Sequence, residues 1–92
     1  FAGLDTVPSL GVKPPRVAGA PAALECRVRQ IVPLGDGPIA GNLVIGDVLT
    51  IHVDDAVLDA AGRVDPRKLR TVARLGADFW CHTSDLFEQK RP

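Results

Sequence analysis

The side chains best suited to chemistry in this sequence are an imidazole in an apolar stretch and a single indole. His52 follows Val48 and Thr50 along an apolar segment, where it forms either the edge of a core or part of a ligand cavity at the mouth of a barrel. Trp80 is the one tryptophan, and its default role is core packing. A flat aromatic ring at the end of a barrel can equally cover a planar ligand, so both interpretations stay open for each residue.

Basic side chains are dense between residues 67 and 74, and acidic groups are sparse around them. One interpretation is a solvated helix face. The other is that Arg74, which directly precedes Leu75 and Gly76, points at an anionic cofactor. A guanidinium suits a phosphate because it donates two parallel hydrogen bonds. The basic residues concerned are Arg67, Lys68, Arg70 and Arg74.

The two cysteines and two histidines do not have the spacing of a metal site. Cys81 and His82 are adjacent, so on a strand they face opposite ways, and no pair shows the short spacing typical of zinc ligands. We therefore predict no metal. Cys26 falls on the apolar side of an alternating segment, and we expect both thiols to be buried and reduced, as in a cytoplasmic protein. A redox-active Cys81 is the less favoured alternative.

Two segments have the pattern of long strands. Residues 22–32 alternate, with Leu24, Cys26 and Val28 on an apolar face and Glu25 on the polar face, which predicts a half-buried strand. Residues 42–54 are largely apolar on both faces, which is typical of a central barrel strand. Gly46 in its middle indicates a bulge or bend. The Asp-Gly and Pro at residues 34–38 form a turn signal, so the two strands are expected to pair as a long antiparallel hairpin.

The remaining elements are short. Asp65 before Pro66 predicts the start of a short helix, because Asp caps and Pro fits the first helical position. Residues 77–83 could form one further strand. Residues 1–22 are rich in Pro and Gly and are expected to form an extended lead-in. The pattern is therefore mainly β, with one long hairpin and one short helix.

Length and charge exclude several classes of protein. The chain has 92 residues, 11 basic and 11 acidic, which allows one domain at most and gives no net charge. A nucleic-acid or anionic-membrane binder needs an excess of basic charge, so neither is expected. No apolar run approaches the ~20 residues of a membrane span. The chain lacks Met and begins Phe1-Ala2-Gly3, which predicts a processed product or a piece of a longer chain.

Five segments, in the same order and with similar gaps, resemble the flavin reductase-like, FMN-binding split-barrel family. Each motif is weak alone, but five in register are fairly specific, and the similarity covers nearly the whole chain. The segments are Val12-Lys13-Pro14-Pro15-Arg16-Val17, Ala20-Pro21-Ala22-Ala23-Leu24-Glu25-Cys26, Leu43-Val44-Ile45-Gly46-Asp47-Val48, His52-Val53-Asp54-Asp55 and Arg74-Leu75-Gly76.

The resemblance implies a fold and a function. Residues 1–92 would be the C-terminal half of such a domain, a partial antiparallel split β-barrel whose N-terminal half lies outside this sequence. Members are typically homodimers that bind FMN, and many use NAD(P)H to reduce flavin for a partner monooxygenase. By this resemblance His52 and Arg74 would contact flavin or nicotinamide, Gly76 would allow close backbone approach, and Trp80 would be an aromatic wall.

Departures from the family pattern keep other functions open. The family often has a second Gly and then a Tyr where this chain has Ala77 and Trp80, and some flavin reductases carry a His where Gly41 and Asn42 stand. The missing His bears on whether the protein uses NAD(P)H. The alternative to a flavin reductase is a non-catalytic β-domain that acts as an FMN-binding electron carrier or as a protein-interaction module.

Overall fold

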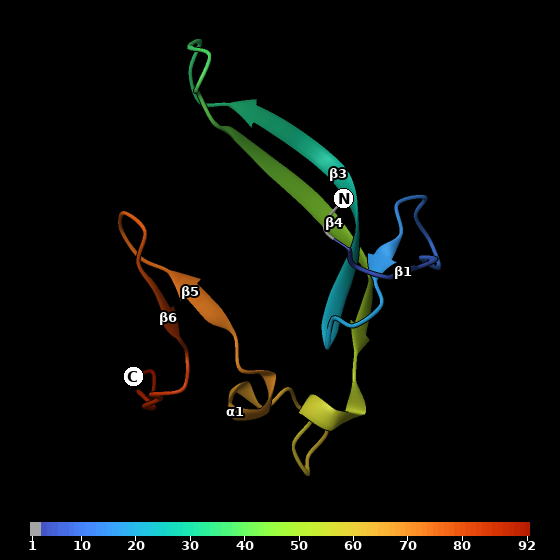
Figure 1. Ribbon diagram of the computed structural model, residues 1–92, viewed down its shortest axis with the longest axis vertical. Helices are drawn as coiled ribbons and strands as arrows, with labels where there is room; N and C mark the ends of the chain where they lie inside the picture. The colour runs from blue at the N-terminus through green and yellow to red at the C-terminus, as the bar shows by residue number, and fades with distance from the viewer. Residues whose placement is uncertain (1–2) are drawn as a thin grey trace. The chain divides into compact units, whose positions relative to one another are not determined.

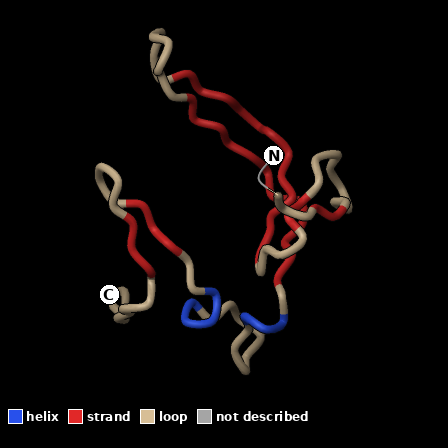
Figure 2. Tube along the Cα trace, in the orientation of Figure 1, coloured by secondary structure: helices blue, strands red, loops and turns tan. Residues whose placement is uncertain are grey.

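The computed structural model describes residues 3–92, and its regular structure is mainly β (Figures 1 and 2). The chain divides into two compact units, Phe1–His52 and Val53–Pro92, and each is described by itself. Three two-stranded sheets and one short α-helix make up most of the regular structure, and no closed barrel forms within the described part of the chain. The predicted class, a partial antiparallel β-structure with a long hairpin and one short helix, is confirmed.

The first unit is dominated by the hairpin of β3 (Ala22–Pro33) and β4 (Asn42–Val53), whose strands run in opposite directions in Figure 1. The connecting loop is closed where the Leu34 amide donates to the Gly41 carbonyl at 3.0 Å. In the middle of the hairpin, a Cβ on Gly46 would lie 3.4 Å from the Arg27 carbonyl oxygen. Glycine at this position therefore permits a close approach of the two strands.

Both faces of this hairpin keep apolar side chains exposed among the described residues. The prediction that both faces of β4 are largely apolar is confirmed, and many of these apolar side chains are exposed in residues 3–92. The exposed apolar residues of the two strands are Leu24, Val28, Ile31, Leu43, Val44, Ile45, Val48, Leu49 and Ile51. An exposed surface of this kind is typical of a sheet that packs against further polypeptide.

Two predictions for β3 were wrong. Cys26 was expected to be buried, and it is exposed, as is Cys81 in the second unit; both are free thiols. Glu25 was expected on the solvated face, and it is buried with 2% of its surface exposed. The reason is that the preceding loop folds over the Glu25 side of the strand, while the Cys26 side has no cover in the described residues.

The first 22 residues also depart from the predicted extended lead-in, of which residues 1 and 2 lie outside the described part. β1 (Thr6–Val7) and β2 (Arg16–Val17) pair antiparallel, with Thr6 opposite Val17. The prolines at 8, 14 and 15 fall in the loop between them, where no strand hydrogen bond is lost. Ser9 donates its hydroxyl to the Pro14 carbonyl at 2.6 Å and so closes that loop.

The second unit begins with two short helical segments, η1 (Asp55–Val57) and α1 (Pro66–Leu69). The predicted start of α1 is confirmed, because the Asp65 carboxylate accepts from the Arg67 amide at 2.9 Å and Pro66 takes the first turn. Arg70 ends the helix in the left-handed region at φ 53°. Val57 is 6% exposed, and its carbonyl accepts from the Asp65 amide, which joins η1 to α1.

The unit ends in the hairpin of β5 (Val72–Arg74) and β6 (Trp80–His82). The strand predicted over residues 77–83 is shorter than expected, because residues 76–79 form the turn. The basic residues 67–74 do not share one helix face, since α1 ends at Leu69 and Arg74 lies in β5. None of the described helices combines the length and apolar character needed to cross a membrane.

Candidate functional site

The β5–β6 hairpin places a guanidinium beside an indole. Arg74 and Trp80 are opposite partners in the strand register, and the Arg74 Cζ atom lies 5.8 Å from the centroid of the Trp80 ring. At this distance the cation is attracted by the ring electrons. Trp80 is 61% exposed, so its default role in a core is wrong for the described residues.

The turn of this hairpin is built around Gly76 and Ala77. The Phe79 amide donates to the Gly76 carbonyl at 3.2 Å, and the Leu75 amide donates to the Phe79 carbonyl at 2.9 Å. Ala77 has φ 52°, a left-handed conformation that favours glycine, and its carbonyl accepts from Arg74 Nη2 at 3.4 Å. The tight turn thereby brings Trp80 back opposite Arg74 and leaves both exposed.

The open end of the hairpin is fixed by two threonines. The Thr83 amide donates to the Thr71 carbonyl at 3.0 Å, and the two hydroxyl oxygens lie 2.7 Å apart. Cys81 pairs with Ala73 and His82 with Val72, so neighbouring side chains of β6 alternate between faces. The described residues hold no group of three or more His, Cys, Asp or Glu side chains arranged for a metal ion.

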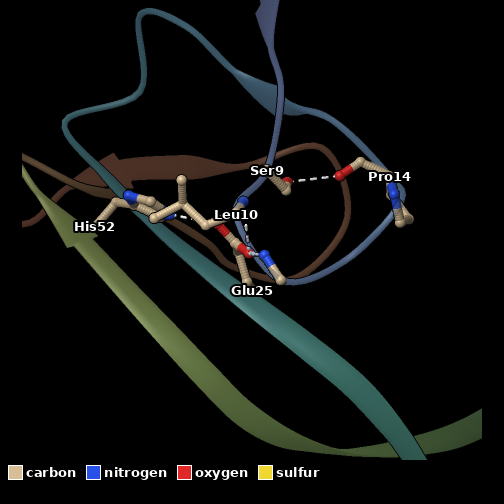
Figure 3. Close-up of polar contacts among 6 residues, drawn as sticks. Ser9, Leu10, Pro14, Glu25 and His52 are labelled. Atoms are coloured by element: carbon tan, nitrogen blue, oxygen red, sulfur yellow. Dashed lines mark hydrogen bonds and ion pairs between the residues drawn. The ribbon is translucent and has the colours of Figure 1, made fainter.

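His52, at the end of β4, belongs to a different cluster in the first unit (Figure 3). Its Nε2 atom lies 2.5 Å from Glu25 Oε2. Glu25 Oε1 accepts from the Leu10 amide at 3.0 Å and from the Gly11 amide at 2.7 Å. These amides, the Leu10 contact foremost, and His52 lower the pKa of Glu25 from 4.5 to about 2.

A pocket of about 410 Å³ opens beside this cluster. Glu25, Arg16 and Cys26 are among the residues that line it, together with apolar side chains of the proline-rich loop. Arg16 Nε is buried and has no hydrogen-bond partner among the described residues. An acidic and a basic residue therefore line the pocket among mostly apolar residues.

Three of the four predicted cofactor residues, Arg74, Gly76 and Trp80, lie on one hairpin, and His52 lies in the first unit. Sequence reasoning missed Glu25 and the two backbone amides that bind it. A glutamate on the polar side of an alternating strand gives no signal of burial, and backbone amides carry no residue signature.

Comparison with known proteins decides the family. Residues 1–73 match the family described as "Flavin reductase like domain".

The chain belongs to the flavin reductase like family.

Relatives of this flavin reductase like chain occur in distant bacteria. It is 41% identical over 92 residues to an uncharacterized protein of Deinococcus radiodurans, covering 97% of this chain and 39% of the relative. It is 34% identical over 94 residues to an uncharacterized protein of Halalkalibacterium halodurans, covering 100% of this chain and 44% of that protein. The chain thus spans less than half the length of these relatives.

Solved structures share the fold of the flavin reductase like chain. Nitrilotriacetate monooxygenase component B from Bacillus cereus superposes with a TM-score of 0.83 at 27% identity, over 94% of this chain and 44% of that one. The Pseudomonas fluorescens 2-nitrobenzoate 2-nitroreductase NbaA superposes with a TM-score of 0.79 at 27% identity. The match covers 98% of this chain and 45% of that one.

Proposed function

We propose that the protein binds FMN and acts as an NAD(P)H-dependent flavin reductase. The observation that carries this proposal is the exposed Arg74–Trp80 pair on the β5–β6 hairpin of a flavin reductase like chain. An exposed indole offers a flat apolar surface for a planar ring, and the adjacent guanidinium offers donors for an anionic group. The residues present therefore fit a flavin.

Each residue of the proposed site has a distinct task. Trp80 covers one side of a planar ring and excludes water from it. Arg74 keeps most of its donors free, because its one hydrogen bond in the described structure is the 3.4 Å contact with Ala77. Gly76 has no Cβ and lets a ligand approach the turn. For the first unit we propose separately that His52 makes a polar contact to flavin or nicotinamide. Bound FMN would supply the hydride and electron chemistry.

Several features of the whole protein belong to the same proposal. Residues 1–92 would form the C-terminal half of the flavin-binding domain, and the protein would be a homodimer. The exposed apolar faces of β3 and β4 support this, because the rest of the domain or a second copy would cover them. A monooxygenase would be the partner that receives reduced flavin. We also propose a cytoplasmic location, which the free thiols of Cys26 and Cys81 suit.

The test is consumption of NADH or NADPH by the protein with added FMN, followed by the loss of nicotinamide absorbance. The proposal expects FMN-dependent oxidation that falls in Trp80→Ala. Phe79→Ala is the matched control, since Phe79 is an exposed aromatic one residue away. Absence of both flavin binding and nicotinamide oxidation would overturn the proposal.

The second candidate is an FMN-binding electron carrier or protein-interaction module without nicotinamide chemistry. The observation that favours it is Gly41 and Asn42 just before the Leu43–Val44 segment, where some flavin reductases have a His. The same assay separates the two candidates. Tight FMN binding with no consumption of NADH or NADPH would favour the electron carrier, and a stable assembly without flavin would favour the interaction module.

A further inference from the structure

The hydrogen bonds around Glu25 determine which nitrogen of His52 carries a proton. The carboxylate is buried with 2% of its surface exposed, and two backbone amides donate to it. Leu10 donates its amide to both oxygens at 3.0 and 2.9 Å, and Gly11 donates to Oε1 at 2.7 Å. A carboxylate that accepts from two backbone amides is in its ionised form and has no proton to give.

His52 must therefore act as the donor in its contact with Glu25. The Nε2 atom lies 2.5 Å from Oε2, and an ionised carboxylate can only accept. In the neutral imidazole one nitrogen is a donor and the other an acceptor, so a proton on Nε2 leaves Nδ1 bare. No described residue makes a hydrogen bond to Nδ1, and the His52 side chain is 19% exposed.

We infer that Glu25 is a positioning residue that fixes the tautomer of the neutral His52 ring, so that the neutral imidazole presents an unprotonated Nδ1 as a hydrogen-bond acceptor. This rests on the proposed function in one respect, that His52 contacts a ligand of the protein. It adds the chemical class of the contact. The neutral ring receives a hydrogen bond from an N–H or O–H group, and does not donate one to a carbonyl or a phosphate.

The loop that contains Leu10 and Gly11 belongs to the same hydrogen-bond network around Glu25. The Gly11 amide donates to Oε1 and the Leu10 amide to both oxygens, while Oε2 also contacts His52 at the end of β4 (Figure 3). A ring held by one strong hydrogen bond to a buried anion loses rotational freedom, which is how a second residue commonly orients a histidine. The loop, β3 and β4 thus hold one imidazole nitrogen toward the carboxylate and leave the other free.

The Glu25→Gln variant provides the decisive test, because glutamine keeps the shape and replaces one oxygen by a donor. Gly11 donates to Oε1 alone and Leu10 also donates to it, so we expect the amide oxygen of glutamine at the Oε1 position, where it accepts from both amides. The amide nitrogen then faces His52 Nε2 and donates to it. The neutral ring must accept through Nε2 and move its proton to Nδ1.

Nitrogen-15 NMR of the imidazole rings measures this directly, at an alkaline pH where titration shows neutral rings. The expected result is a proton on Nε2 in the wild type and on Nδ1 in Glu25→Gln. The exposed His82 is an internal reference whose spectrum stays the same, and His52→Gln assigns the signals. The same His52 tautomer in both proteins would overturn the inference.

A second variant keeps the test decisive if Glu25→Gln fails to fold. Glu25→Ala removes both acceptor and donor, and His52 is then expected to show the nitrogen shifts of the exposed His82. Wild-type shifts in Glu25→Ala would overturn the inference. Flavin plays no part in either readout, so failure of FMN binding would contradict the proposed function and leave the tautomer result unaffected.

Discussion

The carboxylate of Glu25 accepts hydrogen bonds from both the loop at Leu10–Gly11 and the His52 ring at the end of β4. One buried anion thereby joins three segments that are far apart in the sequence. Because its partners are donors, the contact favours the ionised form and lowers the pKa of Glu25 to about 2. The stability of the first unit should therefore depend on pH in acid.

The stabilisation from Glu25 is expected to disappear in strong acid. A carboxyl whose pKa is lower when folded adds stability above its unfolded pKa, 4.5, and loses it as the pH falls through the folded value of about 2. Amide exchange at Leu10 and Gly11 should therefore accelerate relative to other loops between these two pH values. In Glu25→Gln this acid-dependent change should be absent. An equal acid response in that variant would contradict the assignment.

Arg74 is expected to contribute an ionic hydrogen bond to FMN binding. Arg74→Ala should weaken FMN binding by roughly 10-fold or more, since a hydrogen bond to a charged group contributes about 1.5–3 kcal/mol. Arg74→Lys should recover part of the loss, because it keeps the charge and loses the paired donors.

The control for Arg74 is Arg29→Ala, which removes an exposed arginine whose ion pair is with Asp47 at 3.3 Å. An exposed ion pair contributes little to stability, so Arg29→Ala should bind FMN as the wild type does. Equal losses in the two variants would show a general charge effect. Isothermal titration of each variant with FMN measures the affinities.

Ala77→Gly is expected to stabilise the β5–β6 turn. Ala77 has φ 52°, and a side chain in the left-handed region costs about 1 kcal/mol relative to glycine. Because glycine also loses more backbone entropy on folding, the net increase in the free energy of unfolding should be only about 0.5 kcal/mol. Urea unfolding measures it, and Ala77→Val should lower the free energy of unfolding. A loss of stability in Ala77→Gly would contradict the turn geometry.

The cap of α1 gives another stability prediction. Asp65→Ala should lower the free energy of unfolding by about 1 kcal/mol, because the Arg67 amide loses its acceptor. Asp65→Asn should retain most of the stabilisation by the cap, since the amide oxygen of asparagine can still accept the hydrogen bond. Thermal unfolding of the three proteins checks the order wild type, Asn, Ala. Equal stability of wild type and Asp65→Ala would show that the cap contributes nothing.

Local patterns in the sequence were sufficient to predict the long elements. The alternation in β3, the apolar β4 and the Asp65-Pro66 start of α1 each depend on neighbours within a few residues, so they could be found without tertiary information. The strands β1 and β2 have two residues each and exist only through pairing across a proline-rich loop. Such pairing leaves no periodicity to detect.

The candidate site was predictable in part. Arg74, Gly76 and Trp80 came from residue type and resemblance, and the turn at residues 75–79 explains why Arg74 and Trp80 face each other. Burial of Glu25 could not be foreseen, because the donors that bind it are backbone amides 15 and 14 residues away. Strand alternation predicted that Cys26 is buried. This prediction is wrong because no described residue covers that face.

The most direct test of the account is the FMN affinity of the wild type, Trp80→Ala and Phe79→Ala, measured by quenching of flavin fluorescence. Stacking of an aromatic side chain on a planar heterocycle contributes about 1–3 kcal/mol. We expect that the wild type binds FMN, that Trp80→Ala binds roughly 10-fold more weakly or worse, and that Phe79→Ala binds as the wild type does. A wild type that binds no FMN, or a Trp80→Ala variant with wild-type affinity, would contradict it.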